Sequence, residues 1–364
     1  MMIKRIFSIA LIPIFAGYTL VSQAQMVAGQ ERSSPDSNAE VEKLAKEITA
    51  KADDDNDKAY AIYEWVACNI TYDFMGVENV TMGFESTQVV KEALDTGKGV
   101  CQHYAELFHA LAIASDLESL VVSGYTRQNG KIDKVPHAWN ALKINSTWYL
   151  FDPTWGSGYF DGSAYQQEFR DNYFMVKPIE MIKSHMPFDP LFQFLPHPVS
   201  HLNFEKGKNI PGDQAFEVNT DTEDYLTLSE DQQIKESMDR VKSFGIANTM
   251  VRGYYSNLNR RYKVFVANQQ VELHNRAIEK FNKVVEGYNS YATEMNARGG
   301  RLPKNTRPIK NQLETLEEKA YEVQKLFEAI DAPARLALTL SENKKNLEML
   351  LNQIQKDIAR LNNK

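Results

Sequence analysis

The sequence has only two cysteines, Cys68 and Cys101. It contains no cysteine cluster and no His-Glu-x-x-His motif, so nothing in it supports a zinc site, and we expect neither a metal nor another cofactor. In an oxidising compartment, one structural disulfide between the two residues is one interpretation. The alternative is that Cys101 is a working thiol and Cys68 is a small buried residue.

Basic residues are also in deficit. The chain has 41 Lys and Arg against 48 Asp and Glu, which gives a formal net charge of -7 at pH 7, and no basic stripe is present. This balance argues against nucleic acid as a partner. The acidic run at residues 53–57 lacks the glycine and the distal glutamate of a calcium loop. We expect this run to begin a solvated helix instead.

Only one long apolar run occurs, from Ile6 to about Val21. It follows Lys4 and Arg5 and precedes Ser22-Gln23-Ala24, which is a small-x-small cleavage pattern. The run is at the short end for a helix that spans a membrane. Residues 1–24 are therefore predicted to be a signal peptide that is cut after Ala24, which implies a secreted or periplasmic protein with no stable membrane anchor.

The rest of the chain is long enough for two domains. Polar residues 25–40 predict a flexible leader, residues 41–210 predict a mixed first domain, and residues 211–364 predict a domain of long helices. In the second domain, apolar residues recur at alternating steps of three and four, which predicts antiparallel helices packed as a bundle or coiled coil. These stripes are expected to form the core, while the same helices are the candidate docking element for a protein partner. The stripes are Val271, Ile278, Phe281, Val285, Tyr288, Ala292 and Met295; Ile309, Leu313, Leu316, Ala320, Val323, Phe327 and Ile330; and Leu340, Leu347, Leu351, Ile354, Ile358 and Leu361.

The two cysteines have different predicted surroundings. Residues 87–115 predict two helices broken at residues 97–99, with Cys101 at the start of the second. The unpaired N–H groups and the dipole at a helix N-terminus favour an anion, and a thiolate is such an anion. Cys68 falls toward the end of a predicted helix, where the dipole disfavours a thiolate. Cys101 is therefore the candidate nucleophile.

A base for this thiol is predicted on a hairpin. Two strand-like runs, at residues 137–144 and 147–153, are joined at Asn145-Ser146. With a two-residue turn, Asp152 faces Trp139, and His137 and Asp152 share one face of the sheet as diagonal neighbours. Asp152 can then orient the His137 imidazole, which can pair with Cys101. A turn of odd length would place the two side chains on opposite faces.

These motifs together resemble the transglutaminase-like superfamily, and within it a bacterial branch related to kyphoscoliosis peptidase. The resemblance covers roughly residues 55–205. It is carried by Gly-Val-Cys at 99–101, Ser-Gly-Tyr at 123–125, His-Ala-Trp-Asn at 137–140, Trp-Tyr-Leu-Phe-Asp-Pro-Thr-Trp-Gly at 148–156, Tyr-Phe at 173–174 and His-Met-Pro at 185–187.

The resemblance implies an α+β, papain-like core in which the cysteine helix packs on an antiparallel sheet. It implies Cys101, His137 and Asp152 as nucleophile, base and orienter, and the backbone N–H of Cys101 as an oxyanion donor. Tyr72 is the candidate side-chain donor, although it is equally consistent with simple packing. Trp139 and Trp155 are the further candidates for the oxyanion or substrate side.

The implied reaction is attack of the thiolate on a peptide or carboxamide carbonyl, which forms a thioester acyl-enzyme. Water as the acceptor gives a cysteine peptidase or amidase, the outcome that we favour. An amine acceptor such as lysine gives transglutaminase-type cross-linking. A further alternative is a non-catalytic module that binds an envelope protein. In every case the expected substrate or partner is a protein or peptide.

Overall fold

The computed structural model describes residues 35–74, 86–161 and 164–363, with side chains from residue 39 onward. The predicted signal peptide, residues 1–24, lies outside the described residues, as does most of the predicted leader. None of the described helices combines the length and the apolar character that a membrane crossing requires.

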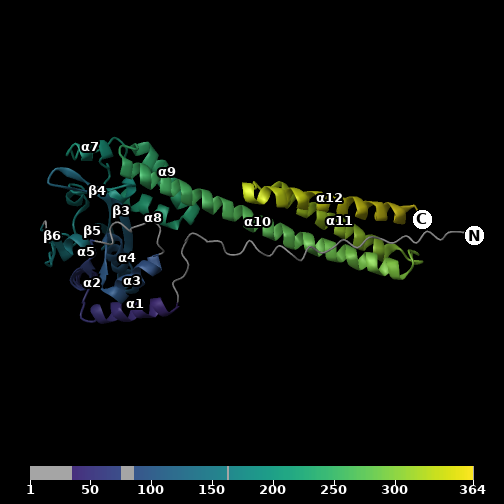
Figure 1. Ribbon diagram of the computed structural model, residues 1–364, viewed down its shortest axis with the longest axis horizontal. Coiled ribbons are helices and arrows are strands. Elements are labelled where there is room, and N and C mark those ends of the chain that lie inside the picture. Colours follow the sequence, from purple (N-terminus) through teal and green to yellow (C-terminus); the bar gives the residue numbers. More distant parts are fainter. Residues whose placement is uncertain (1–34, 75–85, 162–163, 364) are drawn as a thin grey trace, which may run out of the picture. The chain divides into compact units, whose positions relative to one another are not determined.

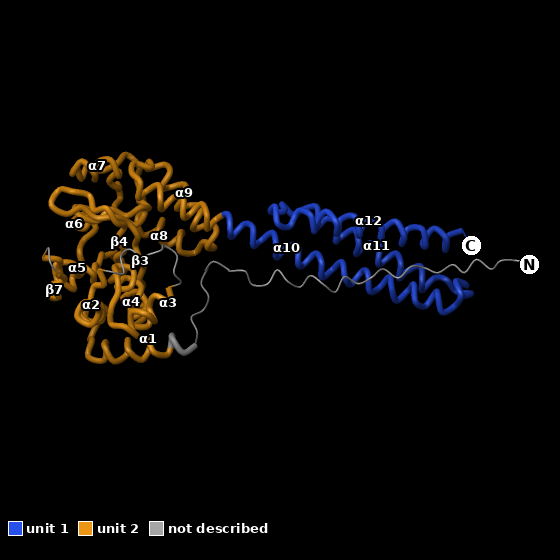
Figure 2. The backbone as a smooth tube through the Cα atoms, in the orientation of Figure 1, with its two compact units in different colours: residues 1–27, 263–364 blue, residues 28–262 orange. Residues whose placement is uncertain are grey.

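The described chain forms two compact units (Figure 2). The unit that ends at Tyr262 comes first in the described chain and is called the first unit here; it is unit 2, orange, in Figure 2. The helices from Lys263 onward form the second unit, which is unit 1, blue, in that figure. The division falls between Tyr262 and Lys263, inside helix α10 (Thr249–Ala297). The sequence predicted this boundary after residue 210. The physical reason for the difference is that residues 218–262 pack on the first unit, as shown below.

In the first unit, four helices precede the main sheet. They are α1 (Pro35–Ile48), α2 (Asp55–Asn69), α3 (Ser86–Thr96) and α4 (Cys101–Ala114). Asp54 caps α2 by accepting a hydrogen bond from the N–H of Asp57 at 2.9 Å, so the acidic run begins a helix as predicted. Two short strands, β1 (Thr71–Tyr72) and β2 (Lys98–Gly99), pair in parallel and place Tyr72 opposite Gly99, two residues before Cys101.

The main sheet has four antiparallel strands in the order β5-β4-β3-β8. Figure 1 labels β3, β4 and β5 of this sheet. Their bounds are β3 (Glu118–Gln128), β4 (Lys131–Ile144), β5 (Thr147–Phe151) and β8 (His185–Pro187). We expected His137 to open its strand, but β4 begins at Lys131. The extension arises because β3 and β4 form a hairpin of their own around Asn129 and Gly130, both of which have positive φ.

The β4–β5 hairpin has the predicted register. Asn145 and Ser146 both adopt positive φ, 50° and 62°, as a two-residue type I′ turn requires. Asn140 pairs with Phe151, and Ile144 pairs with Thr147, so the turn has even length. His137 and Asp152 therefore lie on one face of the sheet, as the sequence analysis required.

The alternation of side chains along β4 buries both faces of the sheet. Leu142 and Ile144 pack in a core with helices α1 to α4, and Trp139 and Ala141 pack in a second core on the opposite face. Gly124 of β3 allows a close approach there, because a Cβ at this position would lie 2.2 Å from the Met186 carbonyl oxygen and 2.5 Å from the Trp139 ring. This glycine therefore lets β8 and the Trp139 ring pack tightly against β3.

Between β5 and α10 the chain forms short elements and two longer helices. They are α5 (Pro153–Ser157), β6 (Gly158–Phe160), β7 (Tyr165–Gln167), α6 (Pro178–Met181), the 3-10 helix η2 (Pro190–Gln193), α7 (His201–Glu205), α8 (Val218–Thr227) and α9 (Glu230–Phe244). Ser229 and Gln232 begin α9 with a capping contact, from the Ser229 N–H to the Gln232 Oε1 at 3.0 Å.

Helices α8, α9 and the start of α10 belong to the first unit because of what they bury. Val241 and Val251 share a core with Tyr125, Met186 and Phe188 of the sheet region. Arg240 of α9 makes a two-pronged ion pair with the buried Asp189, with Nε and Nη2 each 2.8 Å from a carboxylate oxygen. An apolar core and a buried ion pair thus hold this segment on the first unit.

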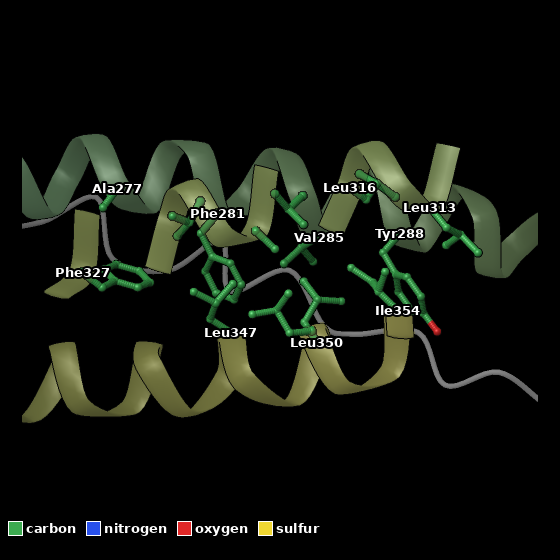
Figure 3. Packing of buried hydrophobic residues seen from close by; sticks show 14 of the residues in the cluster. Ala277, Phe281, Val285, Tyr288, Leu313, Leu316, Phe327, Leu347, Leu350 and Ile354 are labelled. Carbon is green, nitrogen blue, oxygen red and sulfur yellow. The ribbon is translucent and has the colours of Figure 1, made fainter. Parts of the chain in front are cut away.

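The second unit is a bundle of α10 from Lys263 onward, α11 (Arg307–Glu328) and α12 (Ala334–Asn362). The predicted stripes supply its core, and Figure 3 shows Phe281, Val285 and other stripe residues pointing toward one another between the helices. A buried polar contact lies within this core: the Tyr288 hydroxyl donates to Asp357 Oδ2 at 2.9 Å. The helix breaks lie between Ala297 and Arg307 and between Glu328 and Ala334.

Candidate active site

Cys101 is the first residue of α4, as predicted. The N–H of the preceding residue, Val100, donates to Nδ1 of His103 at 3.2 Å, and this contact fixes the start of the helix. The first-turn N–H groups of an α-helix have no carbonyl partner within the helix, so they point past its N-terminus. The Cys101 thiol is half-buried and free. The Cys101 residue and a set of unpaired backbone N–H groups thus lie together at the start of α4.

Cys68 has a contrasting environment near the C-terminal end of α2. It is exposed, so the expectation of a small buried residue was wrong, because its position on α2 faces away from the core. Both cysteines are free thiols, so the disulfide interpretation does not describe this structure either. Burial and the nearby Glu64 carboxylate raise the pKa of the Cys68 thiol. The predicted positions are confirmed: Cys68 lies near the end of α2, and Cys101 begins α4.

His137 and Asp152 are in direct contact. His137 Nε2 lies 2.7 Å from Asp152 Oδ2, and the two side chains are 9% and 0% exposed. The carboxylate can only accept a hydrogen bond, so Nε2 carries the proton that it donates. This leaves Nδ1 of His137 as the ring nitrogen available to the thiol.

Asp152 receives more donors than the sequence analysis anticipated. It caps α5, where its Oδ1 accepts from the N–H groups of Thr154 and Trp155 at 2.9 and 3.0 Å. Its Oδ2 accepts from Nε2 of a second histidine, His185 of β8, at 3.0 Å. The sequence analysis named residues 185–187 only as part of a motif. It did not predict that β8 pairs with β3, and this pairing brings His185 beside His137.

The charges in this cluster reinforce one another. Burial alone lowers the pKa of His137, but Asp152, followed by Cys101, opposes it so strongly that the pKa is raised to about 10. Burial alone raises the pKa of Asp152, but His137 and His185 hold it well below its usual range. Asp152 is therefore an anion and His137 an imidazolium at neutral pH.

Cys101 is also among the groups that raise the pKa of His137, so its side chain lies near the imidazole. One contact ties the two elements that carry them: Nδ2 of the buried Asn140, on β4, donates to the Ala105 carbonyl oxygen of α4 at 2.9 Å. The strand of His137 is thereby anchored to the helix of Cys101.

The three aromatic candidates have different environments. Burial, then Cys101 and Asp152, raises the pKa of Tyr72, so its hydroxyl lies within the electrostatic reach of the thiol. Trp155 is half-buried and its ring centroid lies 5.8 Å from that of His137. Trp139 is fully buried, with its ring 6.0 Å from His137. It therefore shields the imidazole rather than lining a surface that a substrate reaches.

Within the described residues, His137, Asp152 and His185 form the group with metal-ligand geometry, with ligand atoms within 4.8 Å of one another. Both imidazoles already direct a protonated Nε2 at Asp152 Oδ2. A metal ion would have to displace both protons, so the contacts are those of a hydrogen-bond network.

Comparison with known proteins identifies similar sequences. Residues 42–153 match the transglutaminase-like superfamily. Kyphoscoliosis peptidase of Homo sapiens is 29% identical over 174 residues, which cover 45% of this chain and 26% of that protein. Its Mus musculus counterpart is 30% identical over 171 residues, which cover 44% and 25%. A candidate cysteine protease structure from Cytophaga hutchinsonii is 24% identical and covers 32% of this chain and 37% of that chain, with a TM-score of 0.27.

The chain therefore carries a transglutaminase-like domain over residues 42–153, related to the corresponding region of kyphoscoliosis peptidase. It spans about a quarter of the length of these curated relatives. The helical bundle of the second unit lies outside the superfamily match.

Proposed function

We propose that this protein is a cysteine enzyme that cleaves peptide or carboxamide bonds through a thioester acyl-enzyme, with Cys101, His137 and Asp152 as nucleophile, acid–base and orienter. The observation that carries the proposal is the buried His137–Asp152 contact at 2.7 Å, together with the effect of the Cys101 thiol on the same imidazole. In this arrangement, the imidazolium stabilises a thiolate at the start of α4.

Each group then has a defined task. The Cys101 thiolate attacks the carbonyl carbon, and the oxyanion is stabilised by the Cys101 N–H, with the Tyr72 hydroxyl as the candidate second donor. His137 gives its Nδ1 proton to the leaving amine or ammonia, and the thioester remains. His137 then takes a proton from the acceptor, which attacks the thioester and regenerates the thiolate.

The acceptor determines the outcome. Water gives a peptidase or amidase, which we propose, and a lysine amine gives transglutaminase-type cross-linking. Mass spectrometry of candidate peptides, with and without added amine, separates the two. We expect products that carry a new carboxylate in the presence of amine, and no product with Cys101→Ala. A product that gains the mass of the amine instead would establish acyl transfer.

The proposed site of action is the periplasm or the outside of the cell. The N-terminal pattern supports export, because a basic start, an apolar run and a cleavage pattern follow one another within residues 1–24. The intact mass of the protein recovered from its native cells tests this proposal. Cleavage after Ala24 leaves Gln25 as the first residue, and a full-length mass would refute it.

The cationic His137 ring predicts a His137-dependent alkylation of Cys101. The pKa of His137 is raised to about 10, so its imidazolium persists from neutral pH to that value. A cation beside a sulfur favours the thiolate, which is the form that iodoacetamide modifies. We expect iodoacetamide to modify Cys101 at neutral pH more slowly in His137→Gln than in the wild type.

Cys68 provides an internal control, because the same digest reports its alkylation and its raised pKa predicts slow labelling at neutral pH. Turnover should fall as the pH rises through about 10, since the proton donor for the leaving group is lost there. A Cys101 rate that is slow and unaffected by His137→Gln would favour a non-catalytic binding module.

A further inference from the structure

His185 is a buried titratable residue that the proposed mechanism does not use. Its side chain is 0% exposed, and it lies on β8, outside the residues that match the superfamily. Both ring nitrogens have partners: Nε2 contacts Asp152 Oδ2 at 3.0 Å, and Nδ1 contacts the Ser184 hydroxyl at 2.8 Å. A fully buried histidine with two fixed contacts, one of them to the orienting carboxylate, indicates a defined role.

The partners determine the tautomer of His185. Asp152 can only accept, so Nε2 of His185 carries a proton. Burial lowers the pKa of His185, which favours the neutral ring, and Nδ1 is then an acceptor for the Ser184 hydroxyl. His185 is thus a neutral donor, whereas His137 on the same carboxylate oxygen is charged.

Aromatic rings enclose the two histidines. The Trp155 ring centroid lies 4.4 Å from that of His185, and those of Trp139 and Tyr173 lie 5.1 and 6.0 Å away. Asp152 is itself 0% exposed. Water therefore does not supply the hydrogen bonds that an ionised carboxylate needs, and protein groups must do so.

We propose that His185 is a positioning residue for the triad: its Nε2–H completes the hydrogen bonding of Asp152 Oδ2, so that the carboxylate stays ionised and directed at His137. This inference rests on the proposed function for its effect on catalysis. The hydrogen bond from His185 is one of the causes that hold the pKa of Asp152 low, and its loss must raise that pKa. The other charged groups that act on His185 are His137 and Asp133.

A matched pair of substitutions tests the proposal. Gln places a side-chain N–H near the position of Nε2, whereas Leu supplies no donor. We expect His185→Leu to lower kcat about 100-fold with little change in KM, which is the scale of a misaligned catalytic group. His185→Gln should recover most of this loss. Equal losses in both variants would mean that His185 only fills space, and an unchanged kcat in His185→Leu would overturn the proposal.

A second measurement does not depend on activity. An Asp with a depressed pKa stabilises the fold above its unfolded pKa, and this contribution is lost as the pH falls. His185→Leu raises the pKa of Asp152 and reduces the contribution, so the midpoint of acid unfolding should move to higher pH, whereas His185→Gln should stay near the wild type. An unmoved midpoint in His185→Leu would refute the contact even if the protein proved to have no catalytic activity.

Ser184→Ala keeps the test informative if both His185 variants fail to fold. It leaves the imidazole and its contact with Asp152 in place but removes the hydroxyl that contacts Nδ1. We expect a smaller loss of kcat than in His185→Leu, with an unchanged midpoint for thermal unfolding. Full activity in Ser184→Ala would contradict a role for the Nδ1 contact in holding the His185 ring. If the wild type shows no turnover, or if its turnover does not depend on His137, the proposed function alone is refuted.

Discussion

Replacing Asp152 with Asn should lower kcat by about 10⁴-fold, the scale measured for the corresponding change in a serine protease triad. Asn keeps an oxygen that can accept from the N–H groups of Thr154 and Trp155, so the cap of α5 survives. The amide NH₂ group then faces Nε2 of both His137 and His185. The NH₂ group is a donor, so it cannot accept the hydrogen bonds that the two Nε2–H groups give to Asp152. Both imidazoles must therefore carry their protons on Nδ1, which leaves each Nε2 as an acceptor.

For His137, this change of tautomer removes the lone pair from the nitrogen that serves the thiol. The charge of the carboxylate is also lost, and it is the strongest influence that raises the pKa of His137. The thiolate–imidazolium pair therefore loses its support from two directions. We expect alkylation of Cys101 at neutral pH to slow in parallel with turnover.

The measurements are kcat on a peptide that the wild type cleaves, and the alkylation rate at neutral pH. Asp171→Asn is a matched control, because Asp171 is exposed and the substitution removes the same charge. Thermal unfolding shows whether Asp152→Asn is folded. A folded Asp152→Asn protein within tenfold of the wild-type kcat would mean that Asp152 does not orient the base.

Replacing Arg240 with Met should destabilise the first unit by about 3–5 kcal/mol, the usual cost of removing one partner of a buried ion pair. The Asp189 side chain is 0% exposed, so its charge is left in a site that water does not reach. Ser237 and the N–H of Leu191 still donate to Asp189, but neither supplies a compensating charge. The expected fall in Tm is roughly 6–20 °C for a unit of this size.

Tryptophan fluorescence isolates this effect, because all four tryptophans lie in the first unit, at positions 65, 139, 148 and 155. Lys183→Met is the matched control. Lys183 pairs with Glu180 in an exposed contact, with both side chains 55% exposed, and such pairs contribute about 1 kcal/mol or less. If Arg240→Met and Lys183→Met unfold at the same temperature, the ion pair does not hold α9 on the unit.

The sequence predicted those parts of the site that depend on local rules. Helix periodicity placed Cys101 at the start of α4, and the two-residue turn at Asn145-Ser146 placed Asp152 beside His137. Both inferences use short-range geometry: the helix period, the alternation of a strand and the length of one turn. The core residues of the bundle could be predicted for the same reason, because the apolar stripes follow the helix period.

Long-range pairing explains what the sequence did not reveal. The strand of His185 has only three residues, and its place beside β3 depends on the close approach that Gly124 allows. No periodicity indicates such a contact. The boundary at residue 210 was misplaced for a related reason: the helical pattern changes there, but the packing of Val241 and the ion pair of Arg240 extend the first unit to residue 262.

The hydrogen bond between Tyr288 of α10 and Asp357 of α12 limits how these two helices can align along their axes. An apolar heptad pattern alone tolerates sliding of one helix by seven residues, which is about 10 Å at 1.5 Å per residue. Such a slide would carry the Asp357 carboxylate beyond reach of the Tyr288 hydroxyl and leave it with Gln353 of its own helix as a partner. The Tyr288–Asp357 contact thus favours one axial alignment of α10 and α12 over others that the leucines would accept.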